Sequence, residues 1–232
     1  MSKVATYLRG HLTGEVDSRT DIRRANAKDA GVLALTPEMV VSPRNTNDIR
    51  KVARFAWQLA EKGHVLPLTA RGSGRGTSGG AISKGAIISL SAHMNSVFEY
   101  DEKQKLVRLQ PGASIEAVQS ALALRGTGIM ALDGLDSRGT IGGAIADNAA
   151  GYMSAKYGSL DENVSQLEVV LANGDVLQTG KISKKEFNRK KGLQGLEGDI
   201  YRGVDAVLEE FADEIKTIHE QDNTGYNAIA RV

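Results

Sequence analysis

A run of glycine, arginine and hydroxyl residues at positions 71–80 is the first part of the sequence able to do chemistry. It reads Arg-Gly-Ser-Gly-Arg-Gly-Thr-Ser-Gly-Gly and directly follows an apolar segment that predicts a strand. Glycine lets successive backbone N–H groups surround an anion, where a larger side chain would block the approach. Two arginines and three hydroxyl groups add further donors. These features favour a diphosphate-binding loop over the alternative, a flexible linker.

This loop matches neither of two familiar phosphate-binding motifs. A Walker A loop would continue into Gly-Lys-Ser or Gly-Lys-Thr and then a helix, and neither follows here. A dinucleotide-binding Gly-x-Gly-x-x-Gly pattern can start at Gly72 and Gly74, but its third glycine is absent.

A second cluster of small residues spans positions 139–151 and reads Gly-Thr-Ile-Gly-Gly-Ala-Ile-Ala-Asp-Asn-Ala-Ala-Gly. Such a segment lets a large flat ligand lie close to the backbone, and we expect Thr140 and Asn148 to be free to hydrogen-bond with it. A tightly packed helix of small residues explains the same composition equally well. The nearby aspartates Asp133, Asp136 and Asp147 are typical turn residues.

Composition narrows the class of protein. The 232 residues are 41% hydrophobic and 25% charged, which is ordinary for a globular chain. The net charge of +1 does not indicate a surface that binds nucleic acid. The sequence has no cysteine, which excludes disulfides, cysteinyl flavin links and thiol nucleophiles. No apolar run approaches the roughly 18 residues of a membrane span, and no signal peptide is evident. We expect a cytoplasmic protein without a metal site.

The elements that must position the two clusters can be read from the apolar pattern. Strands are expected at 39–42, 65–69 and 86–90, with a helix between the first two that begins near Thr46 and ends at Gly63. A crossover helix between strands predicts a small, partly parallel α/β unit over residues 1–95.

Residues 96–232 have a different pattern of apolar segments and turns, which predicts a second subdomain with a larger antiparallel sheet and helices. A helix is expected from Ser114 to Gly126. The Asn173-Gly174 pair predicts a type I′ hairpin turn. The basic segment 181–191 is expected to be an exposed, mobile loop, and residues 200–218 a single helix whose apolar stripe packs in a core. A hairpin is also expected at 97–109.

Several short segments in a fixed order resemble the vanillyl-alcohol-oxidase superfamily, also called the p-cresol-methylhydroxylase type of FAD domain. The similarity is strongest to FAD-linked D-2-hydroxyacid dehydrogenases and covers roughly residues 29–230. The matching segments are Asp29-Ala30, residues 41–49, residues 69–74, Gln110-Pro111-Gly112, residues 140–143, Lys156-Tyr157-Gly158 and residues 168–174.

The resemblance implies an α+β fold of two α/β subdomains that hold FAD between them. Relatives with covalent flavin often carry histidine near position 75, where this chain has arginine, so noncovalent FAD is expected. Residues 164–169 would approach the adenine end. The residues implied in FAD binding are Arg71, Gly72, Ser73, Gly74, Arg75, Gly76, Thr77, Ser137, Gly139, Thr140, Gly142, Gly143, Ala146, Asn148 and Val169.

In this family a substrate domain follows the FAD domain, usually after a segment like Gly225-Tyr226-Asn227, and it is expected to be absent here. The resemblance therefore implies an oxidoreductase module for hydroxy acids such as lactate or glycolate, poorly active until a further domain or partner subunit supplies the substrate site. The histidines, His11, His64, His93 and His219, are expected to be surface or packing residues. The alternatives are a non-catalytic FAD- or nucleotide-binding subunit and another reductase of the same superfamily.

Overall fold

The computed structural model describes residues 3–221, so the Gly225-Tyr226-Asn227 segment lies outside the described residues. The chain folds as two compact units. The first contains residues up to 163 together with 169–176, and the second contains 164–168 and the residues from 177 onward. A subdomain boundary between residues 95 and 96 stays a prediction.

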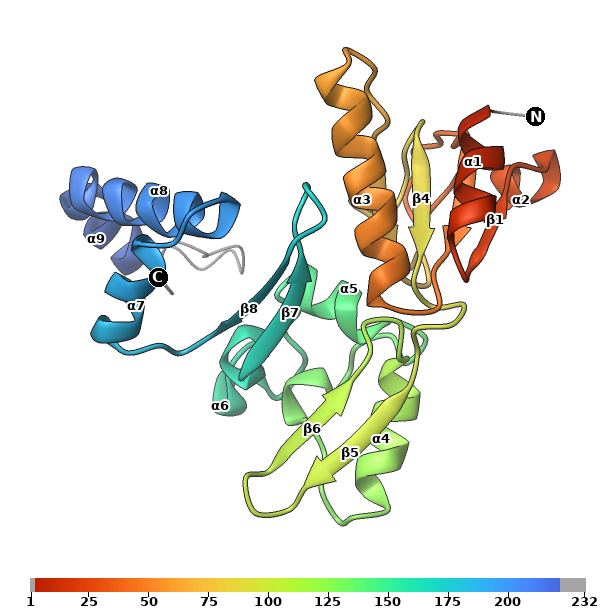
Figure 1. The fold of residues 1–232 in the computed structure, drawn as a ribbon. Helices are drawn as coiled ribbons and strands as arrows, with labels where there is room; N and C mark the ends of the chain where they lie inside the picture. Colours follow the sequence, from red (N-terminus) through yellow and green to blue (C-terminus); the bar gives the residue numbers. More distant parts are fainter. Residues whose placement is uncertain (1–2, 222–232) are drawn as a thin grey trace. The chain divides into compact units, whose positions relative to one another are not determined.

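A mixed four-stranded sheet organises the first unit (Figure 1). Its strands lie in the order β1-β2-β4-β3, and β4 is parallel to both β2 and β3. The expected partly parallel sheet is thereby confirmed. Strand β1, which pairs antiparallel with β2, was not expected, and β3 begins at Leu68 rather than Val65. The strands are β1 Glu15–Asp17, β2 Met39–Ser42, β3 Leu68–Arg71 and β4 Ala86–Ser89.

The central strands β2 and β4 are buried on both faces, which explains why they are continuous apolar runs. One face packs against helix α1 (Lys3–His11) and the long helix α3 (Thr46–Glu61), visible beside β4 in Figure 1. Helix α2 spans Thr20–Ala25. The core on this face contains Leu8, Val16, Met39, Val41, Val52, Ala86 and Ile88.

A hairpin and a capped helix follow the sheet, as expected. Strands β5 (Val97–Asp101) and β6 (Leu106–Leu109) pair antiparallel. Helix α4 (Ile115–Ala123) begins where the Ser114 side chain accepts a hydrogen bond from Ala117 N at 3.1 Å. The remaining short elements of this unit are η1 Met130–Leu132, α5 Ile141–Ala146, α6 Ser154–Tyr157 and η2 Leu160–Asn163.

Strands β7 (Gln166–Val170) and β8 (Val176–Gly180) form a second two-stranded sheet. The strands after residue 95 in the described chain thus form two separate two-stranded sheets rather than one larger sheet. The expectation of a type I′ turn was wrong, because Gly174 has φ of +84° while Asn173 does not have a positive φ. The Asn173 side chain instead accepts a hydrogen bond from Asp175 N at 2.9 Å, which holds the turn in another form.

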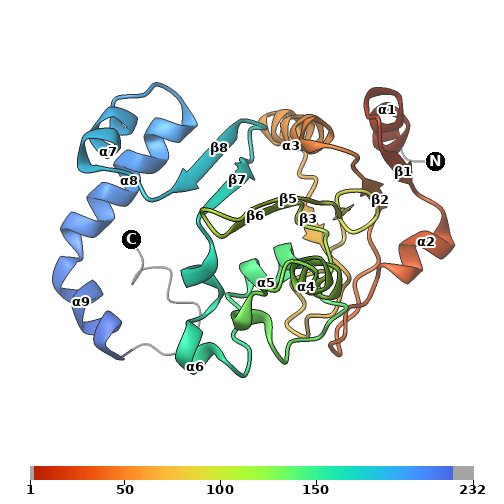
Figure 2. The ribbon, with the colours of Figure 1, turned by 90° about the horizontal axis from the view of Figure 1, so that it is seen from below.

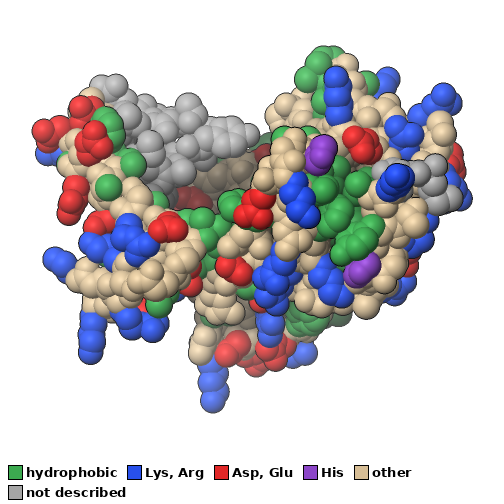
Figure 3. Space-filling model, turned by 45° about the horizontal axis from the view of Figure 1, so that its top comes forward, with side chains coloured by type: hydrophobic (Ala, Val, Ile, Leu, Met, Phe, Trp, Pro, Cys, Tyr) green, Lys and Arg blue, Asp and Glu red, His purple; other side chains and the backbone are tan. Residues whose placement is uncertain are grey.

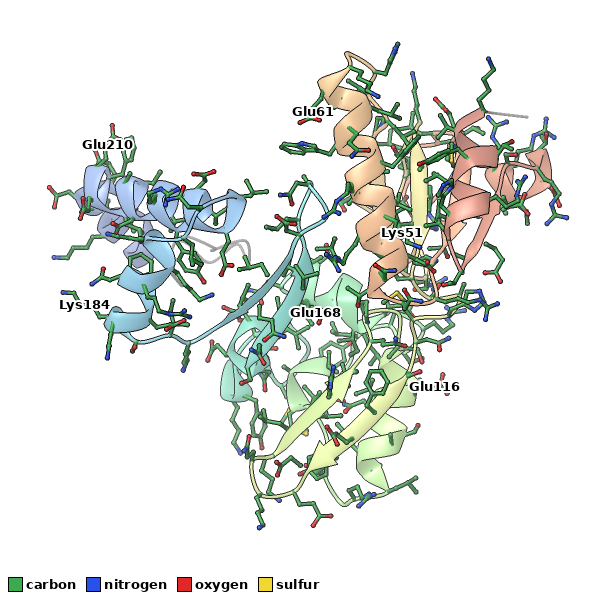
Figure 4. All side chains as sticks on the ribbon, in the orientation of Figure 1. Lys51, Glu61, Glu116, Glu168, Lys184 and Glu210 are labelled. Atoms are coloured by element: carbon green, nitrogen blue, oxygen red, sulfur yellow. The ribbon has the colours of Figure 1, made fainter. Side chains whose placement is uncertain are left out.

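The second unit contains helices α7 (Lys184–Lys191), α8 (Leu196–Glu210) and α9 (Ala212–Gln221). Figure 4 labels Lys184 on α7 and Glu210 at the end of α8. The expectation of a mobile loop at 181–191 was wrong, since Ser183 caps a helix there by accepting a hydrogen bond from Glu186 N at 3.2 Å.

The expected single helix over 200–218 is two helices, separated at Phe211, where φ is −112° and ψ is 28°. Its apolar stripe is not fully packed, because Val204, Val207 and Phe211 are exposed, Val207 by 50%. Within residues 3–221 no helix is both long and apolar enough to cross a membrane. Positive and negative side chains are interspersed on the face drawn in Figure 3.

Candidate functional site

The loop that follows β3 presents a row of unused backbone donors. Among the described residues, the backbone N–H groups of residues 72–78 donate to no protein acceptor. The loop begins at the carboxyl end of a parallel strand, and Gly74 and Gly79 adopt positive φ angles of 68° and 81° that let it turn sharply. Residues 71–80 contain no carboxylate. This arrangement suits an anion better than a cation.

Arg71 holds the loop together from inside. Its side chain is buried, and the guanidinium donates to the carbonyl oxygens of Lys28 at 2.8 Å and Ala81 at 3.0 Å. A Cβ added at Gly74 would lie 2.2 Å from Nη2 of Arg71, so the loop closes directly over the guanidinium. Burial lowers the pKa of Arg71, and the nearby Asp29 carboxylate opposes that shift. The side chain therefore organises the loop from inside.

Asp29 braces the same loop from a neighbouring segment. One carboxylate oxygen accepts from Gly79 N at 3.0 Å and the other from Gly31 N at 2.8 Å. Ala30 N also donates to the carbonyl oxygen of Gly76 at 3.1 Å. Sequence reasoning noted Asp29-Ala30 as a matching segment but assigned it no role. The Asp-x-Gly spacing, which favours a carboxylate accepting from a backbone N–H two residues later, was the available signal.

The second small-residue cluster forms both a helix and a tight turn. Thr140 is 5% exposed and caps α5 by accepting from Gly143 N at 3.4 Å. Asn148, with φ of +43°, accepts from Asp161 N at 2.9 Å. Each side chain thus accepts one bond within the turn through its oxygen, and the expectation that both hydrogen-bond with a ligand stays a prediction.

The N-terminal ends of α4 and α5 lie together (Figure 2). Ile115 N donates to the carbonyl oxygen of Gly139, and Glu116 N to that of Ser137, both at 2.9 Å. Gly142 N donates to the carbonyl oxygen of Pro111 at 2.8 Å, and a Cβ at position 142 would lie 2.8 Å from that oxygen. Glycine is thus required at position 142 by a close backbone approach.

The two glycine clusters, which are far apart in the sequence, meet in the structure. A Cβ added at Gly72 would lie 2.0 Å from Oγ1 of Thr140. Nearby, Nε of Arg75 donates to Oδ2 of Asp136 at 2.6 Å. Sequence reasoning treated Asp136 as a turn residue and so missed its contact with the first loop. No local sequence pattern predicts an ion pair between side chains 61 positions apart.

The other expected site residues are placed as follows. Ser73, Gly76 and Thr77 lie in the loop of residues 72–78, which we call the donor loop. Ala146 ends α5, and Val169 lies half-buried in β7. The hairpin that β7 opens is held to α3, since Nε of Arg50 donates to the carbonyl oxygen of Gly174 at 3.0 Å.

The histidines with described side chains lie outside both clusters. His93 pairs with Glu15 at 2.5 Å, and His11 stacks on Tyr7 with ring centroids 4.0 Å apart. His64 follows the end of α3, with its backbone N–H bonded to the Leu59 carbonyl at 2.9 Å. None of them serves the two glycine clusters.

The residues present fit the diphosphate of a dinucleotide. Free N–H groups of the loop and the Arg75 cation offer donors and positive charge, and glycines keep the backbone open. Cβ atoms at Gly76 would meet no atom within 4 Å, so that side of the loop is open space. The second cluster places further small residues next to this loop through the Gly72–Thr140 contact.

Comparisons with known proteins agree with this chemistry. Residues 37–180 match a family model described as an FAD binding domain. The chain is 28% identical to a D-2-hydroxyglutarate dehydrogenase of Pseudomonas putida, over 94% of this chain and 22% of that protein. It is 35% identical to glycolate oxidase subunit GlcD of Bacillus subtilis, over 74% of this chain and 36% of that protein.

A solved structure, 6-hydroxy-D-nicotine oxidase from Arthrobacter nicotinovorans, aligns with a TM-score of 0.62 at 25% identity, covering 76% of this chain and 38% of that one. The chain thus spans well under half the length of the proteins it matches.

Proposed function

Since the chain belongs to the family of FAD binding domains, we propose that it is the FAD-binding module of an oxidoreductase that oxidises a D-2-hydroxy acid. The observation that carries the proposal is the loop at residues 72–78, whose backbone N–H groups donate to no protein acceptor among the described residues. In the proposal these groups and Arg75 bind the diphosphate of FAD. When bound, FAD accepts a hydride at N5.

The chain's own contribution is to bind and orient the cofactor. In the proposal, Val169 would lie toward the adenine, and the residues that would line the diphosphate, ribityl chain and flavin ring are Ser137, Gly139, Thr140, Gly142, Gly143, Ala146 and Asn148. The attachment is noncovalent, because the sequence has no cysteine and residues 71–80 contain no histidine. We also propose a cytoplasmic location, which suits a chain without disulfides.

The substrate class follows from the names of the matched relatives, which act on D-2-hydroxyglutarate and glycolate. Lactate belongs to the same chemical class. Oxidation requires a base on the substrate hydroxyl and close positioning of the substrate carbon. The histidines with described side chains lie outside both clusters, so we propose that a further domain or a partner subunit supplies that base.

The experiment is an anaerobic reduction of the FAD-loaded chain. D-lactate, glycolate and D-2-hydroxyglutarate are added separately, with L-lactate as the stereochemical control and dithionite to define full reduction. We expect slow bleaching of the flavin by a D-2-hydroxy acid, or none until the substrate-binding part is added. Rapid reduction by NADPH and by no hydroxy acid would contradict the proposal, because that pattern belongs to a reductase.

A further inference from the structure

An ion pair joins the donor loop to the segment that precedes α5. Arg75 extends from the loop, and its Nε lies 2.6 Å from Oδ2 of Asp136. Both side chains are about two-fifths exposed, at 40% and 38%. An exposed pair of this kind contributes little to folding stability, so its position between the two clusters calls for another explanation.

The Asp136 carboxylate is held in a fixed orientation by its own neighbours. Its other oxygen, Oδ1, accepts from the backbone N of Arg138 at 3.0 Å and from Nε of Arg138 at 3.5 Å. One oxygen therefore serves the local turn while the other faces Arg75. This carboxylate is an oriented acceptor rather than a freely rotating surface group.

Arg75 is bound in a way that leaves most of its donors unused. A guanidinium has five N–H donors, and within the described residues only Nε of Arg75 makes a hydrogen bond. Its two terminal amino groups stay available for a second anion. Arginine is well suited to this double role because its planar fork holds donors in fixed directions.

The local charge also permits an anion. Two guanidiniums, of Arg75 and Arg138, surround one carboxylate, so the cluster carries a net charge of +1 from two cations and one anion. A diphosphate approaching Arg75 therefore meets attraction rather than repulsion.

We propose that Asp136 is a positioning residue for the cofactor: it holds Arg75 through Nε so that the terminal amino groups of Arg75 bind the diphosphate. This inference rests on the proposed function. It differs from a competition in which Asp136 occupies Arg75 until FAD displaces it. The single contact through Nε favours positioning, because a competing carboxylate would be expected to engage the terminal amino groups.

The test is the dissociation constant for FAD, measured by flavin fluorescence for the wild type, D136N, R75Q and the double variant. Ordering one arginine side chain in advance is worth about threefold to tenfold in affinity, so D136N is expected to weaken binding by that factor. In the R75Q background, D136N is expected to have no further effect. R125Q, which removes an arginine from an exposed ion pair with Glu102 outside both clusters, is the matched control and is expected to bind like the wild type.

A second readout separates positioning from a loss of structure. The thermal midpoint of each variant is measured without FAD, and all four are expected to agree closely. Tighter FAD binding by D136N would overturn the inference in favour of competition. An equal loss from D136N with and without Arg75 would also overturn it. If the wild type itself fails to bind FAD, the proposed function falls, whereas normal wild-type binding with an unaffected D136N removes only this inference.

Discussion

Gly72 lies so close to Thr140 that a Cβ added at position 72 would stand 2.0 Å from the Thr140 hydroxyl oxygen. Thr140 cannot easily move aside, because it is 5% exposed and caps α5 through its bond from Gly143 N. This contact fixes the donor loop against the second small-residue cluster. It makes the geometry of one cluster depend on the other.

Gly72→Ala is therefore expected to disturb both clusters. Overpacking of this kind costs about 1–3 kcal/mol, so the thermal midpoint should fall and FAD binding should weaken at least tenfold. Gly80→Ala is the control, since a Cβ there meets its nearest atom at an ordinary 3.5 Å. Equal midpoints and equal FAD affinities for the two variants would show that the contact is not a constraint.

Arg71→Lys tests the internal support of the loop. An ammonium group cannot replace the fork that reaches both Lys28 O and Ala81 O, so one buried carbonyl loses its partner. We expect a loss of about 1–3 kcal/mol in the free energy of unfolding and faster hydrogen exchange across residues 72–81. Arg54→Lys, at an exposed pair with Asp175, should change neither quantity. Identical exchange in both variants would argue against this role.

Asp48 is a fully buried carboxylate that accepts from Thr13 N, Thr13 Oγ1, Gly14 N and Arg44 N. Burial acts to raise the pKa of Asp48, but these hydrogen bonds outweigh it and hold the pKa below its ordinary value of 3.8. A pKa lowered by folding stabilises the protein above that ordinary value, and the stabilisation is lost as the pH falls through the folded-state pKa.

Asp48→Asn is accordingly expected to cost about 2–4 kcal/mol at neutral pH, because the amide cannot accept all four bonds. The gap between wild type and variant should shrink as the pH falls below the ordinary value of 3.8 and through the folded-state pKa. Urea unfolding at several pH values measures it. Asp101→Asn, an exposed turn position where the side chain accepts from Lys103 N and Gln104 N, should stay close to wild type throughout. A gap independent of pH would refute the assignment.

Ser183 begins α7, so Ser183→Ala is expected to destabilise that helix by about 1 kcal/mol. The measurement is hydrogen exchange at the amides of residues 184–191. Ser183→Asp retains an acceptor for Glu186 N and should preserve protection. If Ala and Asp behave alike, the cap is unimportant.

The sequence predicts those elements whose signals are local. Met39–Ser42, the Ser114-capped helix and the β5–β6 hairpin follow from short apolar periods and caps, and all three were confirmed. The helix at Lys184–Lys191 was missed because its basic composition suggested a solvent-exposed loop. Ser183 and Glu186 nevertheless have the spacing of a capping box. The break at Phe211 was missed because its apolar period continues across the bend.

The features of the site also divide into those that one segment determines and those that depend on contacts between distant segments. Glycine density at residues 72–80 indicated an anion loop, since that property belongs to one segment. The inward turn of Arg71, the brace from Asp29 and the pair between Arg75 and Asp136 depend on contacts between distant segments. Residue types alone also did not show that the side-chain oxygens of Thr140 and Asn148 each accept a bond from a nearby backbone N–H, which depends on how the chain turns around them.

The most direct test of the central claim is retention of FAD. The purified chain is mixed with excess FAD, passed through a gel-filtration column, and its visible spectrum and bound-flavin stoichiometry are recorded. We expect close to one equivalent of FAD that denaturation releases as free flavin, and a higher thermal midpoint with FAD than without it. A folded chain that elutes without flavin and shows no thermal shift at high FAD would contradict the assignment of residues 72–78 as a diphosphate site.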